Sequence, residues 1–369
     1  MSLKIAIVAL RRSPIRIPYQ GGTEKFIYEL AVGLQKRGHR LTVFASQDSQ
    51  IPKVKVHQIP PFHTYDSTHA GLAVDVAKDL EHYRRIAYHI HQSSFDIVID
   101  SSLKDGFLNF APYLNVPVIN LHHVPLEKSV LNTLIEEQNF FSKVEHVFVS
   151  RSMFKRQAGI INARVIHNGV DVALWRPPLS TRTRENTLCW SGRIVAEKGT
   201  HLALQAAKLT GLPLQFAGPV YDAQYFKERV EPLIDGKQII YRGHLNSKEL
   251  QQMVSTSRAA LFTSVWDEPF GYVLAEAMAC GTPVAGFASG AAPEVHSAKT
   301  AVLVHEYTAS ALAAAIPAAL RLRSTDCVAR AQKKFSLSTM VRRYEKLCFQ
   351  LTRYASHSRY PQLPTRRFS

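Results

Sequence analysis

The chain has 369 residues, of which 46% are hydrophobic and 20% charged, and it carries a net charge of +16. A chain of this length is expected to form two domains, and its apolar content is sufficient for two cores. No apolar run reaches the roughly 20 residues of a membrane-spanning helix, no signal peptide precedes the first predicted strand, and four scattered cysteines favour a reducing compartment. We therefore expect a cytoplasmic protein.

The first half of the chain alternates between buried strands and helices, which predicts a parallel α/β domain. A helix is predicted to begin at Gly21-Gly22-Thr23, because apolar residues recur at helical spacing from Phe26 to Leu34, and to end at Gly38. Apolar runs predict strands at residues 4–10, 41–45, 96–100, 116–121 and 147–150.

A second α/β series begins near residue 187, with strands predicted at 187–191, 214–217, 238–241, 259–263 and 283–286 and helices at 200–210 and 270–280. We therefore predict an N-terminal domain over residues 1–178 and a C-terminal domain over 179–336, joined by the polar, proline-containing hinge 176–186. Residues 337–369 are predicted to form a helix followed by a basic tail. Such a tail is either solvated or attracted to an anionic membrane surface; it has no nucleic-acid-binding motif, and we expect no nucleic-acid partner.

Two acids, Glu268 and Glu276, flank the predicted start of the helix 270–280. Pro269 suits the first turn of that helix, so Glu268 is expected just before the helix and Glu276 about two turns inside it. The carboxylates are then too far apart to meet at one reacting atom, but an extended ligand can reach both. Between them lie the backbone N–H groups of residues 270–272, and such groups at a helix start bind phosphate.

A basic loop, with Gly192-Arg193 at its start and Lys198-Gly199 at its end, follows the predicted strand 187–191. Ligands of parallel α/β domains bind beyond the carboxyl ends of the strands. Arg193 can form forked bonds to phosphate oxygens, and Lys198 supplies a point charge. A diphosphate leaving group needs such neutralisation as negative charge develops on it. In isolation, the same residues would be an ordinary turn with a solvated lysine.

Two features of the first half also lie where strands end. Gly21-Gly22 would let the backbone approach phosphate, although an ordinary capping turn accounts for it nearly as well, and a G-x-G-x-x-G fingerprint is missing. His122-His123 follows the strand 116–121, and a histidine there is either structural or a hydrogen-bonding partner for a ligand. Because no histidine spacing or Asp-x-Asp motif indicates a metal site, we expect no metal.

Together these residues resemble the retaining family 4 glycosyltransferases of GT-B fold, over nearly the whole chain. The motifs are GGTE at 21–24, RGH at 37–39, HNGVD at 167–171, GRIVAEKG at 192–199, Glu268 with EAMACGTPV at 276–284, and SGAAPE at 289–294. The resemblance implies two Rossmann-like parallel-sheet domains facing each other across a cleft. It also implies a nucleotide-diphosphate sugar, most commonly a UDP-sugar, that is a substrate rather than a cofactor, and metal-independent transfer to a hydroxyl acceptor with retention.

The resemblance also implies roles by position. Arg193 and Lys198 would bind the diphosphate, Glu268 would contact the donor sugar, and His122 would lie near that sugar. Glu276 would bind the ribose hydroxyls, and the final helix would return to the first domain. The donor-binding residues so implied are Gly21, Gly22, Gly192, Gly218, His244, Leu245, Phe270, Gly271, Tyr272, Val273 and Glu276.

The acceptor is expected against the first domain, near residues 11–20, 63–69 and 122–128. Arginines in the first of these loops suit an anionic or lipid-phosphate acceptor, or are simply solvated. Two other functions are weighed. A sugar-nucleotide epimerase on a similar scaffold would need an acid–base pair or a cofactor lysine that the sequence does not show. A non-enzymatic anion-binding protein would gain nothing from the acids Glu268 and Glu276.

Overall fold

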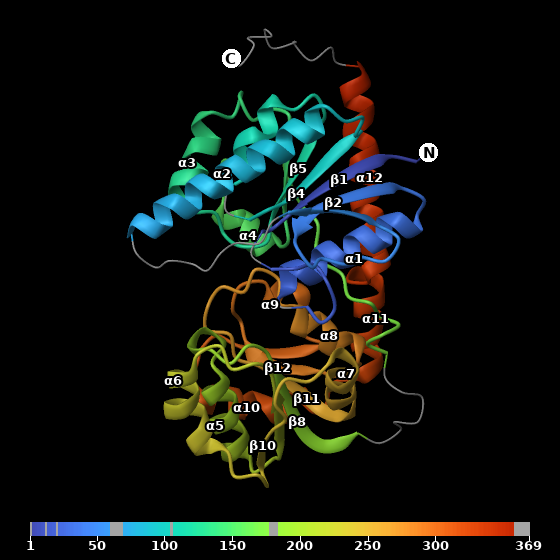
Figure 1. Ribbon diagram of the computed structural model, residues 1–369. Coiled ribbons are helices and arrows are strands. Elements are labelled where there is room, and N and C mark those ends of the chain that lie inside the picture. Colours follow the sequence, from blue (N-terminus) through green and yellow to red (C-terminus); the bar gives the residue numbers. More distant parts are fainter. Residues whose placement is uncertain are drawn as a thin grey trace. The chain divides into compact units, whose positions relative to one another are not determined.

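The computed structural model describes residues 2–11, 13–19, 21–59, 69–103, 106–176 and 184–357. The chain forms two compact units, each built around its own parallel sheet (Figure 1). Unit 1 consists of Met1–Phe148, Gln157–Ile166 and Val341–Ser369, and unit 2 consists of Val149–Arg156 and His167–Met340. This confirms the predicted fold class of two Rossmann-like parallel-sheet domains.

The described part of unit 1 contains a seven-stranded parallel sheet in the order β3-β2-β1-β4-β5-β6-β7. The strands are β1 Lys4–Ala9, β2 Arg40–Ser46, β3 Lys55–Ile59, β4 Ile97–Ser101, β5 Val118–His122, β6 Val144–Phe148 and β7 Ala163–Val165. The strand order reverses between β1 and β4, and ligands of such sheets bind at that reversal, beyond the carboxyl ends of the strands.

Helices of unit 1 cover this sheet: α1 Gly22–Lys36, α2 His69–His91, the 3₁₀ helix η1 Leu108–Tyr113, α3 Lys128–Glu136 and most of α12 Leu337–His357. α12 packs closely on α1, since the Tyr344 and Phe26 ring centroids are 5.6 Å apart. A Cβ atom at Gly33 would lie only 2.4 Å from a Val341 methyl carbon. Glu345 adds ion pairs to Arg37 and His39, at 2.6 and 3.0 Å.

The described part of unit 2 contains a six-stranded parallel sheet in the order β10-β9-β8-β11-β12-β13. Its strands are β8 Glu185–Ser191, β9 Leu214–Ala217, β10 Ile239–Tyr241, β11 Ser257–Phe262, β12 Val284–Phe287 and β13 Ala301–Val304. Apolar strand residues such as Leu188, Phe216 and Phe287 form one core with α5 and α10. The strand order reverses between β8 and β11, so the loops after these two strands border the expected ligand crevice.

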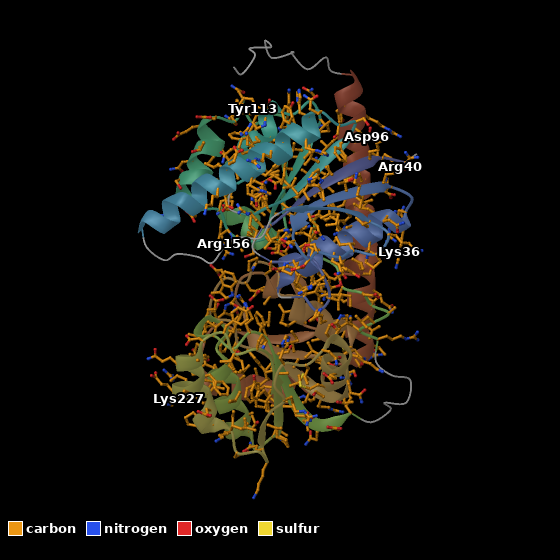
Figure 2. The ribbon with its side chains drawn as sticks, in the orientation of Figure 1. Lys36, Arg40, Asp96, Tyr113, Arg156 and Lys227 are labelled. Carbon is orange, nitrogen blue, oxygen red and sulfur yellow. The ribbon has the colours of Figure 1, made fainter. Side chains whose placement is uncertain are left out.

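The helices of unit 2 are short. They are α4 Arg151–Arg156, η2 Ala196–Lys198, α5 Thr200–Thr210, α6 Ala223–Tyr225, η3 Phe226–Val230, η4 Glu231–Leu233, α7 Ser247–Thr256, α8 Tyr272–Ala279, α9 Ala292–Val295, α10 Ala309–Ala319 and α11 Ser324–Lys334. Charged side chains project outward from both units, for example Lys36, Arg40 and Asp96 in unit 1 and Lys227 in unit 2 (Figure 2).

The division between the units differs from the predicted hinge at 176–186. The Val170 N–H donates to the Phe335 carbonyl and the Leu337 N–H donates to the Val170 carbonyl, both at 2.8 Å, so residues after Ile166 belong to unit 2. Residues 177–183 of the predicted hinge, residues 63–68 and the basic tail after His357 lie outside the described residues. Within the described parts of the chain, no helix combines the length and apolar character needed to span a membrane.

Candidate active site

A lysine and a glutamate meet at the strand reversal of unit 2. Lys198 ends η2 in the loop after β8, and Glu268 lies in the loop after β11. The Lys198 Nζ is 2.5 Å from Glu268 Oε2, and both side chains are only 15% exposed. The same carboxylate oxygen accepts hydrogen bonds from Ser264 Oγ and Trp266 Nε1, each at 3.1 Å. The Lys198 ammonium also lies over the Trp266 ring, 5.0 Å from its centroid.

Hydrogen bonds between the two loops fix this pair. The Val265 N–H donates to the Glu197 carbonyl at 2.9 Å. The Thr263 hydroxyl donates to the Lys198 carbonyl at 2.8 Å and accepts from the Trp190 indole at 2.9 Å. Strand β8 thus orients the loop after β11, and contacts within the protein hold the ammonium and carboxylate together.

A third loop supports the backbone of Glu268. The Ala291 N–H donates to the Glu268 carbonyl at 2.9 Å. At Gly290, where φ is +52°, a Cβ atom would lie 2.2 Å from that carbonyl oxygen and 2.3 Å from the Glu268 nitrogen. Only glycine allows such a close approach of two backbones, which explains the glycine in the SGAAPE motif.

Arg193 lies at the outer part of the same loop. Its guanidinium is 3.4 Å from a Glu197 carboxylate oxygen and stacks over the Tyr221 ring at 5.2 Å. The structure therefore joins Arg193 to the Lys198 loop through Glu197, whereas Lys198 and Glu268 touch directly. At 44% exposed, the Arg193 side chain is accessible to a ligand.

The loops after β8, β9 and β10 are packed against one another. A Cβ atom at Gly218 would lie 1.7 Å from the Gly192 carbonyl oxygen, and the Gly218 N–H donates to the Gly243 carbonyl at 2.9 Å. The structure thus brings Gly192, Gly218 and the segment with exposed His244 and half-buried Leu245 to one edge of the sheet.

The helix that carries Glu276 starts later than expected. α8 begins at Tyr272, not at Phe270, so the expectation that Pro269 lies in its first turn was wrong. The reason is Gly271, whose φ of +77° places it before the helix as its N-cap. A Cβ atom there would be 3.3 Å from Glu268 Cγ, which places the start of α8 beside the glutamate. Phe270 is buried, Tyr272 and Val273 open the helix, and Glu276 is buried in its second turn.

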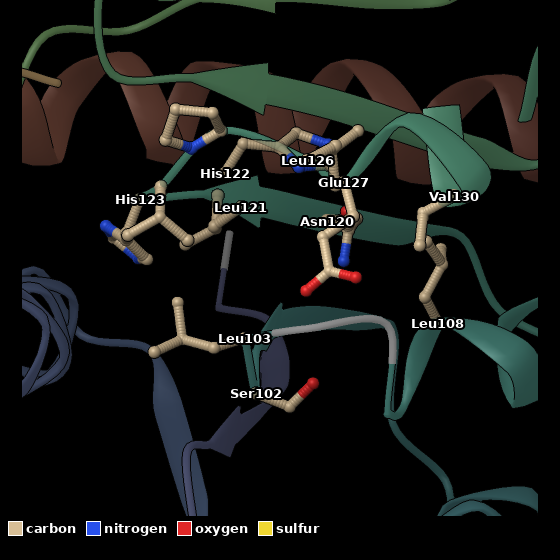
Figure 3. A pocket seen from close by; sticks show the side chains of 12 residues that line it. Ser102, Leu103, Leu108, Asn120, Leu121, His122, His123, Leu126, Glu127 and Val130 are labelled. Carbon is tan, nitrogen blue, oxygen red and sulfur yellow. The ribbon is translucent and has the colours of Figure 1, made fainter. Parts of the chain in front are cut away.

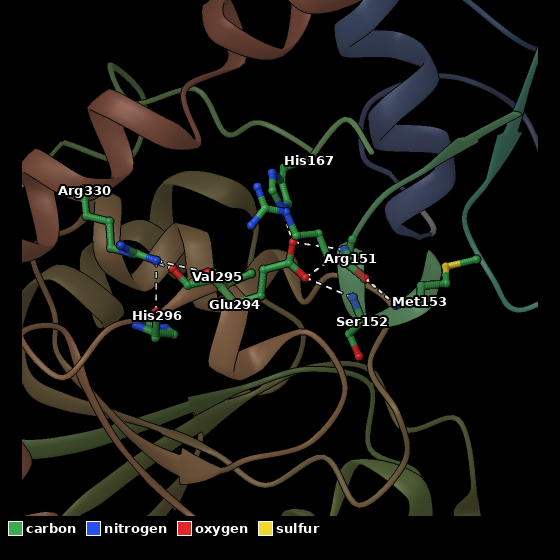
Figure 4. A network of polar contacts seen from close by, with 9 residues as sticks. Arg151, Ser152, Met153, His167, Glu294, Val295, His296 and Arg330 are labelled. Atoms are coloured by element: carbon green, nitrogen blue, oxygen red, sulfur yellow. Dashed lines mark hydrogen bonds and ion pairs between the residues drawn. The ribbon is translucent and has the colours of Figure 1, made fainter. Parts of the chain in front are cut away.

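A second carboxylate, Glu294 of α9, forms a polar network that sequence reasoning missed (Figure 4). It accepts hydrogen bonds from the Arg151 and Ser152 N–H groups at 2.8 and 3.1 Å, and from His167 Nε2 at 2.5 Å. Burial alone would raise the pKa of Glu294, but these bonds outweigh it and lower the pKa. The proximity of Glu294 to His167 could only have been inferred by pairing the HNGVD and SGAAPE motifs.

Arg330 secures the other side of α9. Its guanidinium donates to the carbonyls of Glu294, Val295 and His296 at distances of 2.7–3.0 Å. Because these carbonyls lie at the C-terminal end of a one-turn helix, the bonds satisfy acceptors that the helix itself cannot. Glu294 is thereby fixed from both sides.

In unit 1, the predicted glycines and histidines lie at carboxyl ends of strands. α1 begins at Gly22, with Gly21 in an extended conformation before it. His122 and His123 line a cavity of about 60 Å³ (Figure 3), together with Ser102, Asn120 and Leu126. Asn120 donates to the fully buried Asp100 carboxylate at 2.7 Å, and burial raises the pKa of Asp100 to about 6.

The two histidines have different partners. His122 Nε2 is 3.0 Å from His146 Nδ1, and its ring stacks on Phe148 with centroids 4.4 Å apart. Burial, followed by the neighbouring histidines, lowers the pKa of His122 well below its usual value, so the ring is neutral. His123 Nε2 pairs with the Ser101 hydroxyl at 2.9 Å, and burial lowers its pKa to about 4.

Comparisons with known proteins agree with this arrangement. Residues 20–174 match the model "Glycosyltransferase Family 4" and residues 171–334 match "Glycosyl transferases group 1". Glycogen synthase of Mycobacterium tuberculosis is 30% identical over 197 residues, which are 49% of this chain and 47% of that relative. The chain thus spans about half the length of this relative.

Two further proteins match over most of the chain. D-inositol 3-phosphate glycosyltransferase of Mycobacterium marinum is 26% identical and covers 86% of this chain and 78% of its own length. The crystal structure of Anabaena HepE in complex with UDP and glucose has a TM-score of 0.69 and 19% identity, covering 94% of this chain and 99% of that one. The chain therefore belongs to the family 4 glycosyltransferases of GT-B fold, with a glycosyl transferases group 1 domain as its second half.

Proposed function

We propose that the protein transfers a sugar from a nucleotide-diphosphate sugar, namely a UDP-sugar, to a hydroxyl acceptor with retention of configuration and without a metal ion. The observation that carries the proposal is the half-enclosed Lys198–Glu268 pair at the strand reversal of unit 2. A cation for a leaving phosphate and a carboxylate for sugar hydroxyls stand there side by side. By their names, two relatives are a glycogen synthase and an inositol-phosphate glycosyltransferase, and HepE was crystallised with UDP and glucose.

The hydrogen bonds of Glu268 explain how Lys198 could serve a donor. Glu268 Oε2 has three donors, so it keeps Ser264 and Trp266 when the ammonium turns toward a phosphate oxygen. The Glu268 carboxylate then still accepts hydrogen bonds from Ser264 and Trp266, and its remaining lone pairs accept from the hydroxyls of the sugar. Lys198 can thus exchange Glu268 for a phosphate without leaving the buried carboxylate unpaired. An unpaired buried charge would cost several kcal/mol.

The other residues have complementary roles in this proposal. Glu276 accepts hydrogen bonds from the ribose hydroxyls, and the N–H groups at the start of α8 face the phosphates. Arg193 adds a second cation at the exposed end of the site, and the loops at Gly192, Gly218 and His244 border the nucleotide. In unit 1, His122 remains neutral and offers hydrogen bonding rather than charge.

The reaction proceeds on one face of the sugar. The bond between the sugar C1 and the donor phosphate oxygen breaks as the acceptor oxygen bonds to C1 from the same side. The acceptor proton passes to the departing phosphate oxygen. Lys198 and Arg193 stabilise the negative charge that develops on the diphosphate, and no protein nucleophile is required.

Incubation with UDP-, GDP- and ADP-sugars tests the proposal through release of nucleotide diphosphate, with and without acceptor extracts. Lys198→Met and Arg193→Gln should lower kcat, the lysine variant by about 10²–10³-fold, whereas Glu276→Gln should mainly raise KM for the donor. Lys208→Met, at an exposed lysine of α5, is the matched control and should behave as the wild type. Unchanged turnover in Lys198→Met would refute the proposed site, and an inverted anomeric product would refute retention.

A further inference from the structure

A groove of about 670 Å³ opens on unit 1 and shares no lining residue with the His122 cavity. It is formed by the loop between β1 and α1, by Tyr28 of α1, and by the segment that leads from β2 into β3. Its volume lies within the roughly 300–1,000 Å³ that is typical of small-molecule sites.

Seven of the nine residues that line the groove have apolar or aromatic side chains. Ile17, Pro18, Tyr28, Pro52 and Val54 are among them, and Ile17 is 61% exposed. Covering such an exposed isoleucine and its apolar neighbours removes apolar surface from water, which lowers the free energy. An apolar group of a ligand that lies along this wall would be stabilised in that way.

The charge around the groove is positive. Arg16 lines the groove with an exposed side chain, and within the described residues it takes part in no ion pair. Lys53 and Lys55 are exposed on the adjacent segment, whereas no Asp or Glu is among the lining residues. An anion placed at Arg16 would therefore meet cations and no opposing carboxylate in the groove.

The position of the groove connects one of its walls to the proposed reaction. That wall comes from the loop that follows β1, at the carboxyl edge of the sheet where ligands of this architecture bind, whereas the other wall runs from the end of β2 to the start of β3. The loop after β1 continues into Gly21 and Gly22, and Tyr28 lies on the helix that these glycines begin, with its ring 5.5 Å from that of Tyr19.

We propose that this groove binds the acceptor and that the acceptor is an amphipathic phosphate that also carries the free hydroxyl to be glycosylated. Its hydrocarbon chain lies on the apolar wall and its phosphate pairs with Arg16. This rests on the proposed function, because it names the acceptor class for the same transferase. The apolar wall by itself would accept a neutral lipid, and the arginine by itself a soluble phosphate. The combination selects a molecule that carries both.

Decyl phosphate below its micellar concentration is a suitable probe, with decanol and inorganic phosphate as half-probes, titrated calorimetrically into the full chain. Decyl phosphate should bind at least ten-fold more tightly than either half-probe. Arg16→Gln and Ile17→Ser should each weaken its binding about ten-fold, whereas Arg40→Gln should not, since Arg40 lies at the amino end of β2.

Unaltered binding in both groove variants, or binding only to phosphatidylglycerol vesicles and not to monomeric decyl phosphate, would overturn the proposal. UDP titrations of the same preparations distinguish failure of the groove proposal from failure of the proposed transferase function. Tight UDP binding without decyl phosphate binding would refute the groove proposal and leave the transferase function standing. Decyl phosphate binding that depends on Arg16, without any UDP binding or donor turnover, supports the groove as a ligand site and defeats the proposed transferase.

Discussion

The Lys198–Glu268 pair allows a quantitative test by a double-mutant cycle. Lys198→Met removes the ammonium from a carboxylate that is only 15% exposed but retains Ser264 and Trp266 as donors. A hydrogen bond to a charged group contributes about 1.5–3 kcal/mol, so we expect the free energy of unfolding to fall by that amount. The larger cost of a buried charge with no partner is not expected, because Ser264 and Trp266 still donate to the carboxylate.

Glu268→Gln should cost a similar amount, because it leaves the ammonium without its carboxylate. The double variant removes both charges together, so its loss should fall short of the sum of the single losses by about 1–2 kcal/mol. All three tryptophans of the chain, Trp175, Trp190 and Trp266, lie in unit 2. Tryptophan fluorescence during urea unfolding therefore reports on the unit that contains the pair.

Purely additive losses, with a coupling energy below about 0.5 kcal/mol, would show that the pair is not a coupled contact in solution. The double variant would then also argue against the partner exchange proposed for Lys198. Lys208→Met combined with Glu268→Gln is the control cycle, and it should show no coupling.

Three further perturbations follow from the packing of each unit. Gly290→Ala should destabilise unit 2 by about 1–3 kcal/mol more than Gly236→Ala in urea unfolding, because both glycines have positive φ but only the first would collide with the Glu268 backbone; equal losses would contradict the close approach. Glu294→Gln should cost stability at pH 7. The lowered pKa means that this contribution is present above the unfolded value of about 4.5 and is lost as the pH falls through the folded pKa, so the gap between wild type and variant should shrink below pH 4.5, and a constant gap would refute the assignment. Tyr344→Phe should be neutral or stabilising by calorimetry, because the buried hydroxyl has no partner among the described residues, whereas Tyr344→Ala should cost about 3–5 kcal/mol; a loss in the phenylalanine variant would reveal a partner.

Much of the architecture could be predicted because its signals are local. Apolar runs marked β1, β4, β5 and β8, and helical spacing marked α1. The strands β3 and β13 were missed, since both are short strands at the edge of a sheet and Lys55–Ile59 mixes charged and apolar residues. The start of α8 was predicted too early because the spacing of apolar residues does not reveal the positive φ of Gly271.

The candidate site shows the same limit. Residues on both loops could be named from motif spacing, but the three donors on Glu268 and the contact of Arg193 with Glu197 depend on how side chains meet across loops. The network around Glu294 joins residues more than 120 positions apart. None of these residues stands out in the sequence by itself, and only the fold brings them into contact.

The interleaving of the two units along the chain has a consequence for biosynthesis. The face of α1 that carries Phe26 receives its cover from Tyr344, near the end of the chain. During translation this apolar face stays uncovered until Tyr344, more than 300 residues after Phe26, has been made. A nascent or truncated polypeptide ending at Ile166 would expose it to chaperones and to other chains, so premature termination should yield aggregating fragments rather than a soluble first unit.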